Sequence, residues 1–223
     1  MDTMNQELST TSEPCDSLAD ALREFNPGVD GQFVPLLERY CRLLWEWNET
    51  HNLTRHTDFP TFVSRDLLDT IELSQEIARG VRVLDVGSGG GVPGIPLAIL
   101  RSDLKMALAE SIAKKSSVLM DVIRKLGLNV HVYSDRAELV LKKQKFDVVT
   151  ARAVAPLSKL LTWFDPCWRS IGELLLIKGR KWVDEQAEAE EAGLLRRVRI
   201  DVIREWETPG RDGRSVILKL TRQ

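Results

Sequence analysis

Residues 81–94 read Val-Arg-Val-Leu-Asp-Val-Gly-Ser-Gly-Gly-Gly-Val-Pro-Gly, and this stretch decides the fold. It opens with a mostly apolar run that is long enough for one buried strand. The glycines that follow let the backbone take positive φ angles and approach a ligand closely. Pro93 suits the first turn of a helix, where no N–H group is needed. The stretch therefore predicts the strand, glycine turn and helix start that bind nucleotide-like ligands in open α/β sheets.

Apolar and helical segments alternate after Gly80, and this extends the prediction to a whole α/β domain. We expect strands at residues 81–86, 105–109, 129–134, 146–151, 172–178, 198–206 and 215–220. Helices are predicted near 93–101, 111–126, 136–142, 156–169 and 182–195. This order gives a mainly parallel sheet with right-handed crossovers. The turn-rich segment 208–214 joins the last two strands without a helix, so they should form an antiparallel hairpin.

The residues before this domain are predicted to be helical. Segments 17–25, 32–48 and 59–79 carry apolar residues at helical spacing. Residues 1–16 are rich in Ser, Thr, Asp and Glu, a composition that is typical of disorder. We therefore expect a disordered tail (1–16), an N-terminal helical cap (17–80) and the α/β domain (81–223).

Asp85 indicates the kind of ligand that the glycine turn binds. Its carboxylate would repel a pyrophosphate and attract S-adenosylmethionine (SAM), whose methionine end carries an ammonium and a sulfonium. Gly89–Gly94 also fits the dinucleotide fingerprint G-x-G-x-x-G, and Glu110 can bind the ribose of either cofactor. An NAD(P)-dependent oxidoreductase and a purely structural turn therefore stay open. The C-terminal hairpin favours SAM, because an antiparallel strand at the end of a parallel sheet is the arrangement of SAM methyltransferases.

The composition argues against several classes of protein. The chain has 223 residues and 43% hydrophobic content, and no apolar run approaches the roughly 18 residues that span a bilayer. The N-terminus lacks the features of a secretory signal. Three cysteines and three histidines indicate neither a disulfide framework nor a metal site. We expect a cytoplasmic monomer with no metal and no membrane partner.

The charge is nearly balanced, with a formal net charge of −2 and a pI near 6.0. A general nucleic-acid binder would be more basic. Any RNA must therefore be held by a local patch or presented by a larger assembly. Small basic clusters occur at Lys114/Lys115, Lys142/Lys143/Lys145, Lys178/Arg180/Lys181 and Arg196/Arg197/Arg199. The simplest interpretation of each cluster is a solvated surface.

Four segments carry a resemblance to a known family. They are Leu43-Leu-Trp-Glu-Trp-Asn-Glu-Thr-His-Asn-Leu-Thr54, the glycine turn 85–96, Glu110-Ser-Ile-Ala-Lys-Lys115 with Asp135-Arg-Ala-Glu138, and Thr150-Ala-Arg-Ala-Val-Ala-Pro-Leu157 with Leu176-Ile-Lys-Gly179. Over roughly residues 33–220 the chain resembles the bacterial glucose-inhibited division protein B family (the RsmG type), guanine-N7 methyltransferases of 16S rRNA in the small ribosomal subunit.

The chain departs from the family's usual pattern at three positions. Asp66 stands where the family usually has a histidine, so any role of that imidazole is expected to be lost. Glu110 replaces a frequent aspartate, and either acid can accept ribose hydroxyls. Gly90 stands where Pro or Ala is common.

The resemblance implies a Rossmann-like SAM methyltransferase domain that acts on 16S rRNA or the small ribosomal subunit. The residues expected to bind SAM are Asp85, Gly87, Gly89, Gly91, Val92, Glu110, Ala137, Glu138 and Arg152. The residues expected to bind substrate are Asn52, Arg152 and Lys178. No catalytic side chain is expected, because guanine N7 carries a lone pair and no proton and so needs no general base. A non-catalytic RNA-binding module with this fold stays open as a further alternative.

Several of these residues have a second interpretation. Asp85 either holds the SAM ammonium or braces the loop, while the N–H groups of Gly87 and of residues 89–91 are expected to face the methionine. Arg152 ends the fourth predicted strand, at the ligand-binding edge, or pairs with a loop carboxylate. Lys178 contacts an RNA phosphate or is simply exposed.

The remaining assignments come mainly from the resemblance. Ala137 and Glu138 resemble the family's adenine-binding turn, although Glu138 also suits a helix N-terminus. Asn52, Thr54, Arg65 and Asp69 either brace the cap or shape the guanine pocket, and the sequence leaves that choice open.

Overall fold

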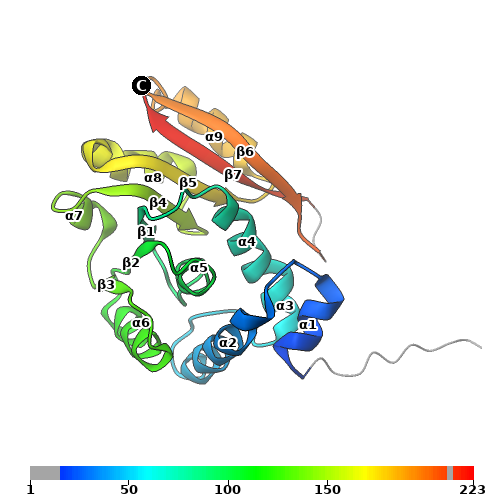
Figure 1. The fold of residues 1–223 in the computed structure, drawn as a ribbon. Coiled ribbons are helices and arrows are strands. Elements are labelled where there is room, and N and C mark those ends of the chain that lie inside the picture. The colour runs from blue at the N-terminus through cyan, green and yellow to red at the C-terminus, as the bar shows by residue number, and fades with distance from the viewer. Residues whose placement is uncertain (1–15, 210–212) are drawn as a thin grey trace, which may run out of the picture.

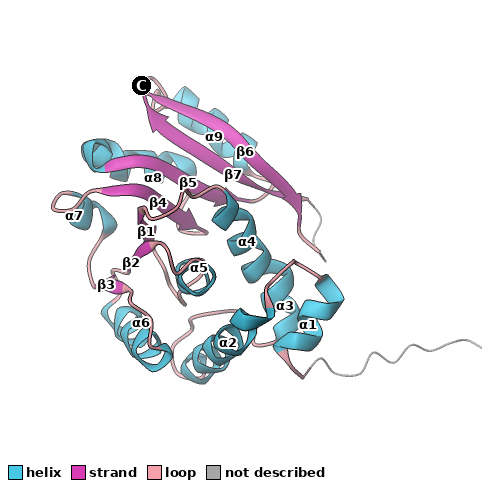
Figure 2. Cartoon of the chain, viewed as in Figure 1, coloured by secondary structure: helices cyan, strands magenta, loops and turns pink. Residues whose placement is uncertain are grey.

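The computed structural model describes residues 16–209 and 213–223 of the chain. Its centre is a seven-stranded sheet with the strand order β3-β2-β1-β4-β5-β7-β6 (Figures 1 and 2). The strands are β1 (Arg82–Val86), β2 (Lys105–Ala109), β3 (His131–Tyr133), β4 (Phe146–Arg152), β5 (Ile171–Lys178), β6 (Val198–Glu207) and β7 (Arg214–Arg222). Strands β1 to β5 pair in parallel, and β7 pairs antiparallel with both β5 and β6. The predicted α/β fold and its C-terminal hairpin are confirmed.

Helices cover both faces of this sheet, because successive residues of each strand point to opposite sides. On one face lie α4 (Leu68–Gln75), α5 (Gly94–Leu100) and α6 (Ala113–Leu126). On the other lie α7 (Ala137–Leu141), α8 (Leu157–Phe164) and α9 (Trp182–Glu191). In β1, Val83 packs into the cluster under α4 and α5, whereas Leu84 and Val86 pack into the cluster under α7, α8 and α9.

The N-terminal helices pack against the α/β domain and share its core. They are α1 (Leu18–Phe25), the 3₁₀ turn η1 (Gly31–Phe33), α2 (Val34–Asn48) and α3 (Phe59–Thr61). Ser17 caps α1 by accepting a hydrogen bond from the Asp20 N–H. Leu37 and Leu44 of α2 belong to one apolar cluster with Ile95 and Leu119, so the cap lies directly on α5 and α6 (Figure 1).

The helix predicted at 59–79 differs from the prediction in its middle. It is interrupted by η2 (Phe62–Leu67), a π-helical segment between α3 and α4. Such wide turns are common at functional sites. This one carries Arg65 and Asp66, and it contains no glycine or proline that would have marked it in the sequence.

The described residues contain neither a cluster of metal ligands nor a membrane-spanning helix. No group of three or more His, Cys, Asp or Glu side chains in 16–209 and 213–223 could hold a metal ion. In the same ranges, no helix is long and apolar enough to cross a membrane. The predicted disordered tail lies outside the described residues except for Asp16, and so do residues 210–212 of the hairpin loop.

Candidate functional site

A cleft of about 280 Å³ opens at the carboxyl ends of β1 and β2. This is the edge where open α/β sheets bind ligands. Its walls include Gly87, Ser111, Ala137, Glu138, Val154 and Trp163. Three residues predicted to bind the cofactor, Gly87, Ala137 and Glu138, are thus brought together in one cleft, from two elements 50 residues apart in the sequence.

The glycine turn after β1 takes the positive φ angles that its sequence predicts. The angles are +64° at Gly87, +55° at Gly89 and +103° at Gly91. However, the expectation that their N–H groups face a ligand is wrong. The Gly87 N–H donates to the Ala109 carbonyl at 2.8 Å, and the Gly91 N–H donates to the Ser88 carbonyl at 2.6 Å.

Glu110, which directly follows β2, accepts a hydrogen bond from the third of these N–H groups, that of Gly89. Its Oε2 accepts a hydrogen bond from the Gly89 N–H at 2.9 Å, and its Oε1 accepts one from the Ile112 N–H at 2.8 Å. The carboxylate is almost fully buried and ties the turn after β1 to the turn after β2. Its neighbours Ala109 and Ser111 line the cleft. A carboxylate oxygen has a second lone pair, so this bracing role is compatible with binding of a ribose hydroxyl.

Asp85 lies beneath the turn and is completely buried. Its Oδ1 accepts a hydrogen bond from the Thr150 hydroxyl at 2.9 Å. Its Oδ2 has no hydrogen-bond partner among the described residues, although the Gly94 backbone lies beside it. Burial raises the pKa of Asp85 to about 6, despite the hydrogen bonds that it accepts. The hydrogen bond from Thr150 thus supports the bracing interpretation of Asp85. Its ionised form is destabilised by burial, and a nearby cation would stabilise it.

Replacing Asp85 with asparagine is expected to flatten the pH dependence of stability. Because the folded-state pKa lies above the usual 3.8, the free energy of unfolding of the native chain falls as pH rises through about 4 to 6. At neutral pH the ionised group then costs on the order of 3 kcal/mol. D85N should therefore be more stable than the native chain at pH 8, with a smaller difference at pH 4.

Urea unfolding at several pH values measures this effect. Asp103 gives a control of opposite sign, because the hydrogen bonds from Arg101 lower its pKa, so D103N should lose stability at neutral pH. A D85N variant that is less stable than the native chain at pH 8 would contradict the account.

The helical cap contacts the same glycine turn from its outer side. The Tyr40 hydroxyl of α2 donates to the Gly90 carbonyl at 2.9 Å. A Cβ atom at Gly90 would lie 3.0 Å from Leu44 and 3.2 Å from the Leu53 carbonyl, so glycine suits this close approach. Val92 packs into the apolar cluster that the cap shares with α5 and α6. Asn52 precedes Leu53 and is exposed.

A second cleft of about 380 Å³ adjoins the first, and Val154 lines both. Its polar walls include Arg65, Asp69, Arg152, Lys178, Glu185 and Ser215. Arg152 and Lys178, two of the three residues predicted to bind substrate, therefore lie in one cleft beside the predicted cofactor site.

Arg152 forms two ion pairs with the helices of the cap. Its Nη2 lies 2.5 Å from Asp66 Oδ1, and its Nε lies 2.8 Å from Asp69 Oδ2. All three side chains are at most 15% exposed. Although burial opposes the shift, the two carboxylates raise the pKa of Arg152. The salt-bridge interpretation of Arg152 is therefore supported, with partners on η2 and α4.

An imidazole does lie beside Asp66, although the residue at 66 is not histidine. His56 Nε2 lies 2.9 Å from Asp66 Oδ2. Burial opposes ionisation of Asp66, but hydrogen bonds from His56 and Arg152 hold its pKa below the usual value. The buried Asp66 carboxylate thus contacts both His56, in the loop after α2, and Arg152, at the end of β4.

Lys178 is held in place and is only 11% exposed at its side chain. Its Nζ donates to the Ala155 carbonyl at 2.8 Å and to Glu185 Oε2 at 2.7 Å. Glu185 also accepts a hydrogen bond from the Leu157 N–H, so the start of α8, β5 and α9 meet at this lysine.

These features fit SAM better than a dinucleotide. A pyrophosphate site needs backbone N–H groups that point at the ligand, whereas the N–H groups of Gly87, Gly89 and Gly91 donate to protein oxygens. The buried carboxylate of Asp85 lies beneath the turn. This arrangement suits a ligand whose reacting end is cationic.

Sequence reasoning missed three residues of this region. Tyr40 lies at an apolar position of α2, where an aromatic residue usually indicates only core packing. His56 lies in a polar loop with no recognisable motif. Trp163 lies on the predicted helix 156–169, and the one available signal was that it falls beside, rather than on, the apolar stripe.

Comparison with known proteins shows which family the sequence matches. Residues 34–211 match the profile of the family described as GidB, rRNA small subunit methyltransferase G. The ribosomal RNA small subunit methyltransferase G of Rhodopirellula baltica is 46% identical over 82% of this chain and 79% of its own length. The protein of the same name from Sorangium cellulosum is 38% identical over 92% of this chain and 87% of its own length.

Solved structures confirm the fold. An O-methyltransferase from Bacillus cereus, solved in complex with SAH, matches 82% of this chain and 90% of its own with a TM-score of 0.57 and 16% identity. The family is decided by the sequence matches to the family profile and to the two rRNA methyltransferases, which cover most of each chain. The chain belongs to the GidB family, described as rRNA small subunit methyltransferase G.

Proposed function

We propose that this protein transfers a methyl group from SAM to N7 of a guanine in 16S rRNA of the small ribosomal subunit. The observation that carries the proposal is the pairing of two clefts at the end of β4. One adjoins the glycine turn above the buried Asp85, and the other is polar and contains Arg152 and Lys178. Family membership supports the same reaction class.

The cofactor residues are proposed to act by shape and charge. Gly87, Ala137 and Glu138 line the first cleft, while Gly89, Gly91 and Val92 form the turn beside it. Glu110 accepts ribose hydroxyls while it holds the turn. Asp85 acts on the ammonium through its charge from beneath the turn. When bound, SAM supplies a methyl group activated by its positively charged sulfur.

The chain need not supply a general base, because guanine N7 has a lone pair and no proton. Catalysis then consists of holding N7 in line with the methyl group, which is a proximity effect. It also includes electrostatic accommodation of the positive charge that moves onto the purine. Asp69 and Glu185 provide negative charge in the second cleft, and Arg152 and Lys178 hold them in place. Asn52 is proposed to contact substrate at the rim.

The cofactor assignment is tested by calorimetric titration of the purified chain with SAH and with NAD⁺. We expect micromolar binding of SAH and much weaker binding of NAD⁺, because the turn offers a dinucleotide few free N–H groups. Tighter binding of NAD⁺ than of SAH would support the oxidoreductase alternative.

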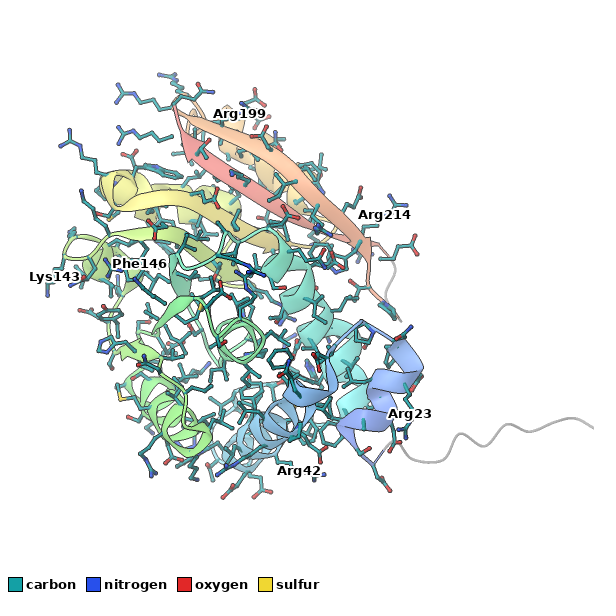
Figure 3. The ribbon with its side chains drawn as sticks, viewed as in Figure 1. Arg23, Arg42, Lys143, Phe146, Arg199 and Arg214 are labelled. Carbon is teal, nitrogen blue, oxygen red and sulfur yellow. The ribbon has the colours of Figure 1, made fainter. Side chains whose placement is uncertain are left out.

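The substrate is proposed to be a structured part of the small subunit. The net charge is −2, and the basic side chains labelled in Figure 3 lie on separate edges: Arg23 and Arg42 on the cap, Lys143 after α7, Arg199 and Arg214 on the hairpin. A free-standing RNA binder would gather such charges on one face. We infer a cytoplasmic monomer that works without a metal.

Methyl transfer from labelled SAM should therefore depend on the presentation of the RNA. We expect transfer into small ribosomal subunits or long 16S rRNA, none into short single strands, and a steep fall with added salt because phosphate contacts dominate affinity. Equal transfer into short unstructured oligonucleotides would contradict the proposal about presentation.

A further inference from the structure

Trp163 forms part of the first cleft, and its exposure is unusual for this chain. All six tryptophans lie in the described residues, and only Trp163 is exposed, at 40% of its surface. Its helix α8 is held to the sheet by four other residues, Leu157, Leu160, Leu161 and Phe164, which are all buried. The indole is thus not needed for the core, and an exposed aromatic surface in a cleft indicates a contact with a ligand.

Trp163 shares the cleft with both apolar and charged residues. Ala109, Ala137 and Val154 are apolar members of its lining, and Asp135, Arg136 and Glu138 are charged ones. The backbone at this end is fixed, since the Cys167 thiol donates to the Glu138 carbonyl at 3.4 Å and so links the segment after α8 to α7. The cleft is thus bounded by Trp163 of α8 and the start of α7 on the one hand, and by Gly87 of the turn above Asp85 on the other.

We propose that Trp163 binds the adenine ring of SAM by stacking, and that it is the main determinant of the cleft's preference for a purine nucleoside. This inference rests on the proposed function, because it takes SAM as the occupant. Stacking needs no hydrogen bond from the protein, and an indole on a helix loses little conformational entropy when it binds. The orientation of the cofactor follows, with the base at α8 and the ammonium at the turn.

The test compares W163A and W163F with the native chain in calorimetric titrations with SAH. W163A should weaken SAH binding by about tenfold or more, in the range found for base–aromatic stacking. W163F should keep most of the affinity because it keeps an aromatic face. Met120 is another exposed large apolar residue, on α6 and outside both clefts, so M120A is the matched control and should bind SAH normally.

Two further measurements separate this inference from alternatives. Methylthioadenosine carries the adenine without the amino acid, so W163A should weaken its binding by the same factor. SAH should quench tryptophan fluorescence in the native chain and in W45F, whose altered residue lies in the cap, but not in W163F.

The outcomes are distinguishable. The role of Trp163 would be overturned if W163A, M120A and the native chain bound SAH with equal affinity. It would also be overturned if W163A weakened the binding of SAH but not that of methylthioadenosine. Either result would leave the SAM assignment intact. Failure of SAH to bind the native chain would instead overturn the proposed function.

Discussion

Replacing Gly89 with valine is expected to abolish SAH binding while the protein stays folded. Gly89 has a φ of +55°, and a Cβ atom there would meet only the Gly87 carbonyl, at 3.8 Å. The fold therefore has room for a side chain, at a cost of about 1–2 kcal/mol for the left-handed backbone. A branched side chain would, however, occupy the space beside the turn that the cofactor needs, and it would disturb the hydrogen bond to Glu110.

Gly80 supplies a matched control for this variant. It has a φ of +74°, a Cβ atom there would meet nothing within 4 Å, and it lies in the turn before β1, at the opposite end of that strand. G80V should thus show a similar loss of stability in urea unfolding but normal SAH affinity in calorimetry. Normal SAH binding by G89V would mean that the glycine turn is not the cofactor site.

Replacing Arg152 with alanine is expected to have the largest effect on stability. The change leaves Asp66 and Asp69 buried without their shared cation, a kind of loss that typically costs about 3–5 kcal/mol. In the folded fraction of R152A, the rate of methyl transfer should fall by a larger factor than the affinity for SAH. The reason is that Arg152 lines the second cleft and not the first.

Arg204 provides the comparison, since it also joins a strand to two carboxylates in or next to α4. Its partners are Glu72 and Glu76, and its side chain is 32% exposed, so R204A should cost only about 1 kcal/mol. Adding D69N to R152A should recover part of the loss, because it removes a stranded charge. Urea unfolding of the four proteins checks this, and equal effects of R152A and R204A would contradict the account.

The sheet could be predicted from the sequence because its signals are local. The apolar run of β1, its glycine turn and the alternation after Gly80 each depend on residues within one or two elements, and the structure confirms their order and the final hairpin. Gly87 was predicted from the glycine turn itself, whereas Ala137 and Glu138 were predicted from the resemblance. The structure brings the three into one cleft, because residues at the carboxyl ends of parallel strands lie at one edge.

The contacts that shape the site could not be predicted, because they join distant parts of the chain. Arg152 pairs with Asp66 across 86 residues, and Tyr40 bonds Gly90 across 50. Glu110 was predicted as a ligand for ribose, but only the structure shows that it accepts the Gly89 N–H. That contact explains the direction of the Gly89 N–H, and the carbonyls of Ala109 and Ser88 explain those of Gly87 and Gly91.

The identity of the methylated atom tests the central claim most directly. The measurement is transfer of tritium from labelled SAM into small ribosomal subunits that lack the modification, followed by digestion of the 16S rRNA and analysis of its nucleosides. We predict that the label is found as N7-methylguanine. Label in a cytosine, an adenine or a guanine amino group would contradict the proposed reaction, as would the absence of any transfer by a chain that binds SAH.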